Sequence, residues 1–257
     1  MDRPDTRAIW DANAPDWIEL SRAGFDVYRD LVNTPAFLAL LPPVDGLRCL
    51  DLGCGEGHNT RLLAGRGARV VGVDISEVFV DAARTVPDGG VRYVVGDGTT
   101  LPFAPASFDA ATAFMSLMDV ADPEGVLGEL GRVVRPGGLL QFSVVHPATS
   151  TPVRRWVEDE AGERQALAIG GYFYEGPVHE RWTFGAAPPE LRADRRPFEI
   201  TYARRTLAGW LNAVLDCGFA IEAIDEPRAD EATAAAHPQV VDTRVAPYFL
   251  IVRARRS

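Results

Sequence analysis

Three glycines at alternate positions, Gly53, Gly55 and Gly57, mark the segment of this chain with the clearest chemical potential. Glycine lets the backbone approach a ligand closely and take positive φ without a Cβ clash. An apolar run then ends in an acid, Asp74, whose carboxylate can accept hydrogen bonds from both hydroxyls of a ribose. Together these residues predict a site for a nucleoside.

The charges around the glycines restrict the kind of ligand. The spacing is G-x-G-x-G and not the G-x-G-x-x-G of dinucleotide sites, and two acids, Asp51 and Glu56, flank or occupy the turn. These acids would repel a pyrophosphate at the N-terminus of the following helix. They would not repel a ligand that carries an ammonium and a sulphonium. The segment therefore predicts a cationic amino-acid nucleoside and disfavours an NAD-dependent oxidoreductase.

The elements that must position these residues follow from the apolar pattern. Residues 48–52 and 68–73 are typical of buried parallel strands, and residues 59–66 are typical of a helix. Strand, glycine turn, helix and strand form the first half of a nucleotide-binding βαβ unit. Asp51, Asp74 and Asp97 are 23 residues apart each time, which predicts that all three acids lie at the carboxyl edge of one sheet.

The run DLGCGEG followed by VVGVD resembles motifs I and II of the class I S-adenosylmethionine-dependent methyltransferases. By pattern it is most similar to the small-molecule enzymes grouped as methyltransferase type 11, which resemble the ubiquinone and menaquinone methyltransferases. LPF and SFD at 101–109, and RPGG at 135–138, are also similar to this group, so the resemblance covers roughly residues 47–145. A weaker match, RTL, GF and EP, extends over 205–227.

The resemblance implies an α/β fold with a Rossmann-like, seven-stranded, mostly parallel sheet, flanking helices and an antiparallel last strand. Residues 44–146 and 201–257 would form the core that binds the cofactor. Residues 1–43 are predicted to form an N-terminal helical lid over the cofactor mouth. Residues 147–200 are rich in proline and aromatic residues, and we expect them to form a substrate cap, inserted after strand 5, that consists of antiparallel strands or a flap.

Matching the family motifs residue by residue implies cofactor contacts at the carboxyl edge. Asp74 would bind the ribose hydroxyls, Asp97 the adenine amine, and Asp51 the ammonium, directly or through water. The other residues implied at this site are Gly53, Gly55, Ile75, Gly98, Phe114, Tyr28 and Arg61. Tyr28 is a candidate for the methionine end of the cofactor, or it packs the lid onto the core. Arg61 could meet the cofactor carboxylate or pair with Glu56.

Methyl transfer is an in-line displacement, so the enzyme must hold donor and acceptor in line and exclude water. It needs a base only where the acceptor loses a proton. His146, directly after the fifth strand, is the candidate base, and the alternative is a structural histidine before Pro147. The residues predicted to line the acceptor pocket are Trp17, Tyr172, Tyr174 and His179. Cysteines and histidines show no ligand spacing, so we expect no metal.

The composition of the chain restricts the classes of partner that we expect it to bind. The formal net charge of -10 argues against a nucleic-acid substrate, because phosphate binding usually needs a basic surface. The first residues form no secretory signal, and no apolar run is long enough to span a membrane. We therefore expect a cytoplasmic monomer or homodimer with no membrane partner.

These observations predict S-adenosylmethionine-dependent methyl transfer to a small-molecule acceptor, at oxygen, nitrogen or carbon, in a biosynthetic pathway. The acidic charge and the aromatic cap favour a neutral or cationic, partly apolar acceptor. One rival is a cyclase or lyase that acts on the aminobutyrate chain of the cofactor and releases methylthioadenosine. A second rival is a protein that binds the cofactor without turning it over.

Overall fold

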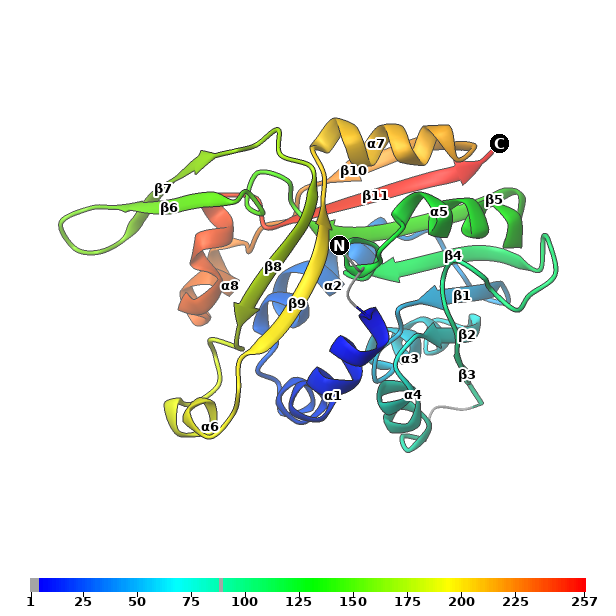
Figure 1. Ribbon diagram of the computed structural model, residues 1–257, viewed down its shortest axis with the longest axis horizontal. Coiled ribbons are helices and arrows are strands. Elements are labelled where there is room, and N and C mark those ends of the chain that lie inside the picture. The colour runs from blue at the N-terminus through cyan, green and yellow to red at the C-terminus, as the bar shows by residue number, and fades with distance from the viewer. Residues whose placement is uncertain (1–4, 88–89) are drawn as a thin grey trace.

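A seven-stranded sheet forms the centre of the molecule in a computed structural model, which describes residues 5–87 and 90–257 (Figure 1). Its strands lie in the order β10-β11-β5-β4-β1-β2-β3, and β11 is antiparallel to both of its neighbours. In chain order the strands are β1 Arg48–Leu52, β2 Arg69–Asp74, β3 Arg92–Val95, β4 Phe108–Phe114, β5 Val134–Val145, β10 Phe219–Asp225 and β11 Phe249–Arg256. The predicted Rossmann-like α/β fold, with an antiparallel last strand, is confirmed.

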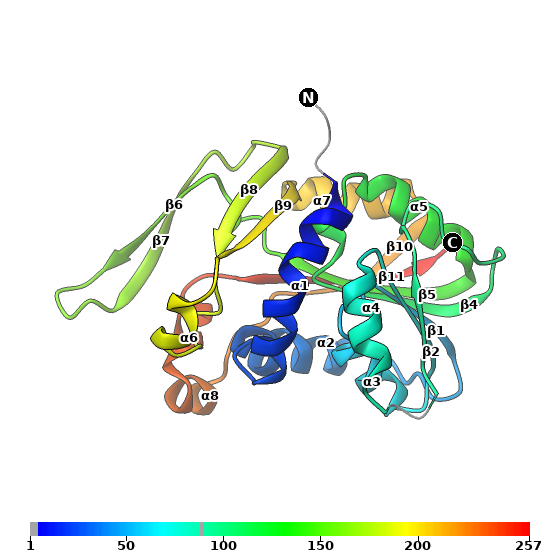
Figure 2. The same ribbon diagram turned by 60° about the horizontal axis from the view of Figure 1, so that its bottom comes forward.

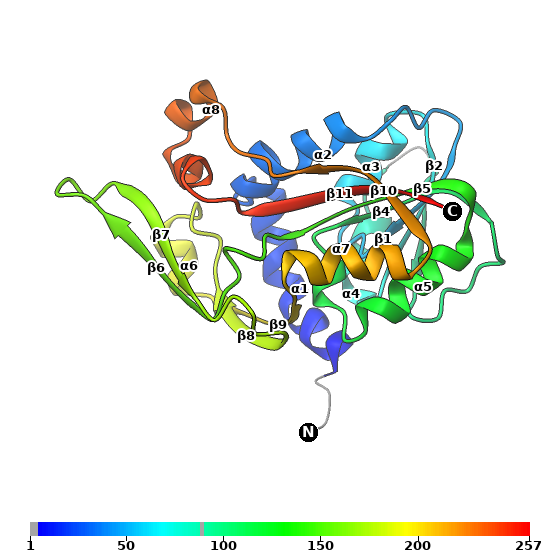
Figure 3. The same cartoon turned by 90° about the horizontal axis from the view of Figure 1, so that it is seen from above.

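Helices cover both faces of this sheet, which explains why the central strands are nearly continuous apolar runs. One face packs against α5 and α7, and the other against α2 and α3 (Figure 3). The helix bounds are α2 Thr34–Leu40, α3 His58–Ala64, α4 Glu77–Arg84, α5 Pro123–Val133 and α7 Leu207–Asp216. Ser76, Asp122 and Thr206 each cap a helix by accepting a backbone N–H, as their sequence positions predict.

The N-terminal segment differs from its prediction in one place. The sequence predicts helices over residues 6–21 and 25–41. The first is α1, Thr6–Arg22, but the second contains a five-residue π-helical turn, Arg29–Asn33, before α2. Such a turn widens the helix locally and is frequent near functional sites, and periodicity alone does not reveal it.

The segment between β5 and α7 forms two antiparallel hairpins (Figure 1). The first pairs β6 Val153–Glu158 with β7 Arg164–Gly170. The second pairs β8 Gly176–Trp182 with β9 Phe198–Arg204 and carries the short α6, Pro189–Ala193, in its connection. Two further elements, α8 Glu231–Ala236 and the 3-10 segment Pro238–Arg244, were not predicted from the sequence.

Helix α1 lies beside β9, although the contacting residues Asn13 and Glu199 are 186 positions apart in sequence (Figure 2). The Asn13 amide donates to the Glu199 carbonyl at 2.8 Å and accepts from the Glu199 N–H at 3.4 Å. Trp17 packs against Trp182, Phe184 and Phe198, each at a ring-centroid distance of 5.1 Å. Within the described ranges, no helix has the length and apolar character needed to cross a membrane.

Candidate functional site

The glycine turn joins β1 to α3 in a conformation that its glycines permit. Gly53 and Gly55 have φ values of 66° and 53°, in the left-handed region. The Gly53 N–H donates to the Val73 carbonyl at 2.7 Å, and the Gly55 N–H donates to Oδ2 of Asp74 at 2.8 Å. A Cβ on Gly53 would lie 2.2 Å from Cβ of Ser116, so the turn is compressed between β2 and the segment after β4.

Asp74 ends β2 inside the site, with 8% of its surface exposed. Besides the Gly55 N–H, its carboxylate accepts the Ser76 N–H at 2.9 Å. Burial raises the pKa of Asp74 to about 6, although these backbone donors act in the opposite direction. A carboxylate can accept about four hydrogen bonds, so Asp74 has capacity for a ligand hydroxyl.

Asp51 lies beneath the turn and not at its surface. Its two carboxylate oxygens accept the hydroxyls of Thr60, at 2.6 Å, and Thr112, at 2.8 Å, and only 1% of the residue is exposed. Burial raises the pKa of Asp51 to about 6. In this arrangement Asp51 ties α3 and β4 to β1. Direct contact with an ammonium would require one of the two hydroxyls to move away.

The remaining motif residues lie along the same edge of the sheet. Asp97 follows β3, is exposed, and accepts the N–H and hydroxyl of Thr99, each at 2.8 Å. Ile75 and Gly98 are half-buried after β2 and β3. Phe114, at the end of β4, packs on Phe37 with ring centroids 3.7 Å apart. The roles implied for these residues stay predictions.

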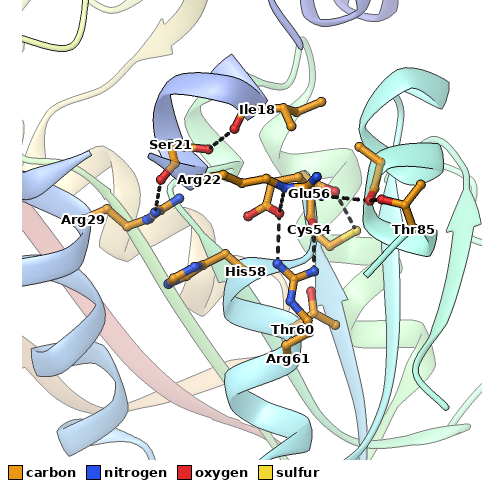
Figure 4. Close-up of polar contacts among 12 residues, drawn as sticks. Ile18, Ser21, Arg22, Arg29, Cys54, Glu56, His58, Thr60, Arg61 and Thr85 are labelled. Atoms are coloured by element: carbon orange, nitrogen blue, oxygen red, sulfur yellow. Dashed lines mark hydrogen bonds and ion pairs between the residues drawn. The ribbon is translucent and has the colours of Figure 1, made fainter. Parts of the chain in front are cut away.

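Helix α1 lies over the glycine turn and is bonded to it (Figure 4). Arg22 donates to Glu56 at 3.0 Å and to the carbonyl of Ala82 at 2.8 Å. From below the turn, Arg61 donates to the same Glu56 carboxylate at 2.9 Å. Of the two roles weighed for Arg61, the structure therefore has it paired with Glu56.

Tyr28 contacts the C-terminal part of the chain. Its hydroxyl donates to the Asp242 carboxylate at 2.8 Å, and Tyr248 and Arg164 bind the same carboxylate, each at 2.6 Å. Asp242 is 2% exposed. We call Tyr28, Arg164, Asp242 and Tyr248 the Asp242 cluster. It joins the N-terminal segment, the β6–β7 hairpin and the approach to β11, so the Tyr28 hydroxyl is already engaged.

His146 follows β5 as predicted, but both of its ring nitrogens have partners. Nδ1 accepts the Ala148 N–H at 3.1 Å, and Nε2 lies 2.7 Å from a carboxylate oxygen of Glu226. Because Nδ1 is an acceptor, Nε2 carries the proton that Glu226 accepts. Burial lowers the pKa of His146, and Glu226 partly offsets this effect. These contacts indicate a residue that fixes the loop, the alternative weighed above, and its role as a base stays a prediction.

The four residues predicted to line the acceptor pocket do not gather at one point. Trp17 lies in the aromatic cluster between α1 and the β8–β9 hairpin. The Tyr172 hydroxyl accepts the Leu207 N–H at 3.1 Å, and the Tyr174 hydroxyl donates to the Pro177 carbonyl at 3.1 Å. His179 is exposed on β8 and lies 2.7 Å from the Thr201 hydroxyl.

Sequence reasoning missed Asp119, which ends the 3-10 turn Leu117–Asp119 after β4. It is 8% exposed, and its Oδ1 has no hydrogen-bond partner among the described residues. The backbone just before this turn is unusual, because Met115 has a φ of 52° without being glycine. One sequence feature could have indicated Asp119: it is the single acid in the apolar run from Phe114 to Val120.

Comparison with known proteins places this geometry in a family. A family model described as "Methyltransferase domain" matches residues 50–142. A crystal structure of an S-adenosylmethionine-dependent methyltransferase from Mesorhizobium loti is 34% identical, with a TM-score of 0.72, and the match covers 86% of this chain and 96% of that one.

Two curated relatives match less than half of this chain. An O-methyltransferase, cnsE, of Penicillium expansum is 38% identical over 122 residues, which are 44% of each protein. A demethylmenaquinone methyltransferase of Clavibacter sepedonicus is 44% identical over 98 residues, 37% of this chain and 40% of that protein. The chain thus matches less than half the length of these two relatives.

Proposed function

This chain belongs to the class I S-adenosylmethionine-dependent methyltransferases, and on that premise we propose that it transfers a methyl group from S-adenosylmethionine to a small-molecule acceptor. The observation that carries the proposal is the glycine turn, whose Gly55 N–H is bonded to the acid that ends β2. This connection fixes the turn and Asp74 relative to each other. It supports a preformed site for the nucleoside part of the cofactor.

The residues present fit the cofactor. A Cβ on Gly53 would clash with the Ser116 side chain, so only glycine allows the turn to lie this close to the segment after β4. Asp74 keeps acceptor capacity for ribose hydroxyls, and Asp97 is exposed at the next strand end for the adenine amine. Asp119 adds a buried carboxyl oxygen without a partner among the described residues at the same edge. This set suits a ligand with hydroxyls, an amine and positive charge.

When bound, the cofactor supplies an electrophilic methyl carbon attached to a positively charged sulphur. The chain's own task is then to position the two reactants and to exclude water. We propose that α1 does this from one side, since Arg22 and the contact between Asp11 and Ser76, at 2.6 Å, hold it on the turn and on α4. The β8–β9 hairpin would close the other side through its contact with α1.

The domain roles predicted from the sequence remain part of this proposal. Residues 1–43 would act as the lid, residues 44–146 and 201–257 as the cofactor-binding core, and residues 147–200 as the acceptor cap. The bonds of α1 to the turn support the first assignment, and the two hairpins support the third. We also propose a cytoplasmic enzyme of a biosynthetic pathway, monomeric or homodimeric, without a nucleic-acid partner.

The acceptor is proposed to be neutral or cationic and partly apolar. The net charge of -10 and the aromatic side chains between α1 and the β8–β9 hairpin support this choice. Trp17, Tyr172, Tyr174 and His179 remain candidates for its contacts, and His146 for the base. In the structure, these five side chains contact hydrogen-bonding or aromatic groups of the chain itself.

The test begins with S-adenosylmethionine alone. Calorimetry should give saturable binding, and mass spectrometry should find the cofactor intact without an acceptor. A panel of phenols, hydroxyquinones and amines is then added, and S-adenosylhomocysteine together with a methylated acceptor is the expected result. Methylthioadenosine formed without acceptor would replace the proposal with cofactor cleavage or cyclisation. Binding with no product from any acceptor would favour the non-catalytic rival.

A further inference from the structure

Asp119 occupies a turn that the fold holds in place at considerable local strain. The chain leaves β4 at Phe114, and Met115 follows with a φ of 52°, in the left-handed region that a residue other than glycine rarely adopts. The Met115 N–H donates to the carbonyl of Ser143 at 3.0 Å, and the Ser116 hydroxyl donates to the Leu52 carbonyl at 2.7 Å. The Asp119 N–H donates to the Ser116 carbonyl at 3.0 Å. The turn is thus anchored to β5 and to the end of β1.

The carboxyl of Asp119 differs from the other deeply buried aspartates. Asp51 accepts two threonine hydroxyls, Asp74 accepts two backbone N–H groups, and Asp242 accepts two tyrosine hydroxyls and an arginine. Oδ1 of Asp119 accepts nothing from the described residues, although the residue is only 8% exposed. A buried carboxylate without donors is unfavourable unless a ligand or a proton compensates it. The fold therefore leaves one carboxyl for something outside the chain.

The location of this carboxyl links it to the cofactor site. Burial raises the pKa of Asp119, and the negative charge of Asp74 raises it further. Asp119 therefore lies near the acid assigned to the ribose. Ser116, three residues earlier, is the residue that a Cβ on Gly53 would strike. The turn and the glycine loop thus face each other across one site.

Within residues 5–87 and 90–257, no cation of the chain compensates Asp119. The 3-10 turn packs against β9, β5 and α5, and among the described residues Asp74 is the one charged group that shifts the pKa of Asp119. The charged or titratable groups of these elements have other partners. On β9, Glu199 pairs with Arg181, and Tyr202 and Arg204 donate to the Ser150 carbonyl. On α5 and on β5 with the residue after it, the pairs are Glu124 with Arg205, Arg132 with Glu129, Arg135 with Asp109, and His146 with Glu226. On α1, Asp11 accepts the Ser76 hydroxyl.

We propose that the Asp119 carboxylate faces the sulphonium end of S-adenosylmethionine and makes the site prefer this charged donor over its neutral product. The inference depends on the proposed function, since it requires the cofactor to bind at the glycine turn. The sulphonium charge stabilises the ionised carboxylate. Once the methyl group has left, the sulphur is a neutral thioether, and Asp119 is again a buried acid without that compensating charge. The product is therefore held less tightly than the donor.

This assignment has a consequence for protons. Burial and Asp74 keep the pKa of Asp119 well above its usual range without ligand, so its protonated form persists to higher pH. Binding of the sulphonium favours the ionised form and releases that proton. The affinity for S-adenosylmethionine should therefore rise as pH rises through the pKa of Asp119. The affinity for S-adenosylhomocysteine should lack this pH dependence, because its sulphur carries no charge. The ribose, adenine and ammonium groups are common to both ligands and therefore do not contribute to the difference.

Calorimetry on the full chain tests the inference without an acceptor. The probes are S-adenosylmethionine, S-adenosylhomocysteine and sinefungin, which carries an ammonium in place of the methylsulphonium. Wild type should prefer the two charged probes, and the preference should increase about tenfold from the acidic to the alkaline end of the pH range in which the protein stays folded. Asp119→Asn should lose about tenfold in affinity for both charged probes and less than about twofold for S-adenosylhomocysteine. Asp81→Asn, at an acid that is 64% exposed, is the control for net charge and should change nothing.

Every outcome is decisive. Equal weakening of all three probes by Asp119→Asn would mean a structural role, and an unchanged preference would mean no contact, so either result overturns the inference. If Asp119→Asn does not fold, the pH dependence of the wild-type preference decides alone: a preference that is constant with pH overturns the proposal. Failure of wild type to bind any probe would overturn the proposed function itself, which separates the two failures.

Discussion

The carboxyl edge of the central sheet and the two hairpins beside it are held together in different ways. At the edge, buried acids bind backbone N–H groups and threonine hydroxyls, and Asp51 and Asp74 are 1% and 8% exposed. The hairpins are joined by ion pairs at the surface, such as Arg154 with Glu180, and leave large apolar side chains exposed, such as Phe173 at 87%.

This difference indicates how the protein would bind its two proposed ligands, the cofactor and the acceptor. Buried, charge-assisted hydrogen bonds are strong and hold one geometry, which suits a cofactor that never changes. Exposed ion pairs contribute little and can rearrange, which suits an acceptor whose shape varies between enzymes. Changes at the edge should therefore affect the cofactor first, and changes in the hairpins should leave its affinity nearly intact.

The largest effect is expected from Gly53→Ala. The new Cβ would lie 2.2 Å from Cβ of Ser116, on a backbone with a φ of 66°. We expect loss of S-adenosylmethionine binding by calorimetry and destabilisation on the order of 2–4 kcal/mol by denaturant unfolding. Gly128→Ala is the matched control, since a Cβ at this position inside α5 would have nothing within 4 Å. It should be neutral or slightly stabilising, and equal damage from both changes would contradict the compression of the turn.

Asp74→Ala should come next. It removes the proposed ribose contact and leaves two backbone N–H donors without their acceptor. Cofactor affinity should fall by about 1.5–3 kcal/mol, as for hydrogen bonds to a charged group. Asp97→Ala, at an exposed strand end, should cost less. Unchanged calorimetric affinity in Asp74→Ala would show that the motif has been assigned to the wrong ligand group.

The pH dependence of stability should belong mainly to the core and lid. The pKa values of Asp26, Asp51 and Asp74 are raised to about 6, and that of Asp119 is also raised, chiefly by burial. Their folded-state pKa values lie above the unfolded ones, so the stability they contribute is present at low pH and is lost as pH rises through about 6. The lowered pKa values of His58 and His146 oppose this trend in part.

Thermal or denaturant unfolding of the ligand-free protein measures this effect. Between pH about 5 and about 7.5, the free energy of unfolding should fall by an amount on the order of 2 kcal/mol. Asp119→Asn should make the decrease smaller, because it removes one titrating group. Stability that rises over the same range would mean that these acids are not buried as described.

The smallest effect is expected from Arg164→Leu. Arg164 pairs with Asp242 at 2.6 Å and lies over the Trp156 ring at 4.7 Å, which ties the β6–β7 hairpin to the core. We expect a loss of about 1 kcal/mol and faster proteolysis within residues 153–170. Cofactor affinity should change less than about twofold. Arg181→Leu removes a pair that is exposed on both sides and serves as control. A large loss of cofactor affinity in Arg164→Leu would contradict the expectation that changes in the hairpins leave cofactor binding at the carboxyl edge nearly intact.

Much of the edge could be predicted because its determinants are close in sequence. Gly53, Gly55 and Asp74 belong to one βαβ unit, and their spacing specifies strand, turn, helix and strand. The short apolar runs before Asp74 and Asp97 then place these two acids at or just after strand ends. The spacing could not predict which hydrogen-bond or ion-pair partner each polar side chain has in the folded chain. The pairing of Arg61 with Glu56 was one of two options in the sequence, and the structure distinguishes them.

The hairpins and the lid were less predictable because their contacts join distant segments. Tyr28 binds Asp242 across 214 positions, in a 3-10 segment that no sequence pattern indicated. His146 has an apolar strand before it and a proline after it, but its partner Glu226 lies 80 positions away. Asp119 was missed for the opposite reason. Its importance lies in the absence of a partner among the described residues, and only a folded structure can reveal that.

The contact of α1 with β9 also constrains how the protein is made. Asn13 and Glu199 are 186 positions apart, so α1 leaves the ribosome long before the strand that it contacts. At about 5–20 residues per second, the delay is roughly 10–40 s. During synthesis, the first helix therefore has no β9 to dock on. Helix α1 can therefore reach its final place against β9 only after residue 199 has been made.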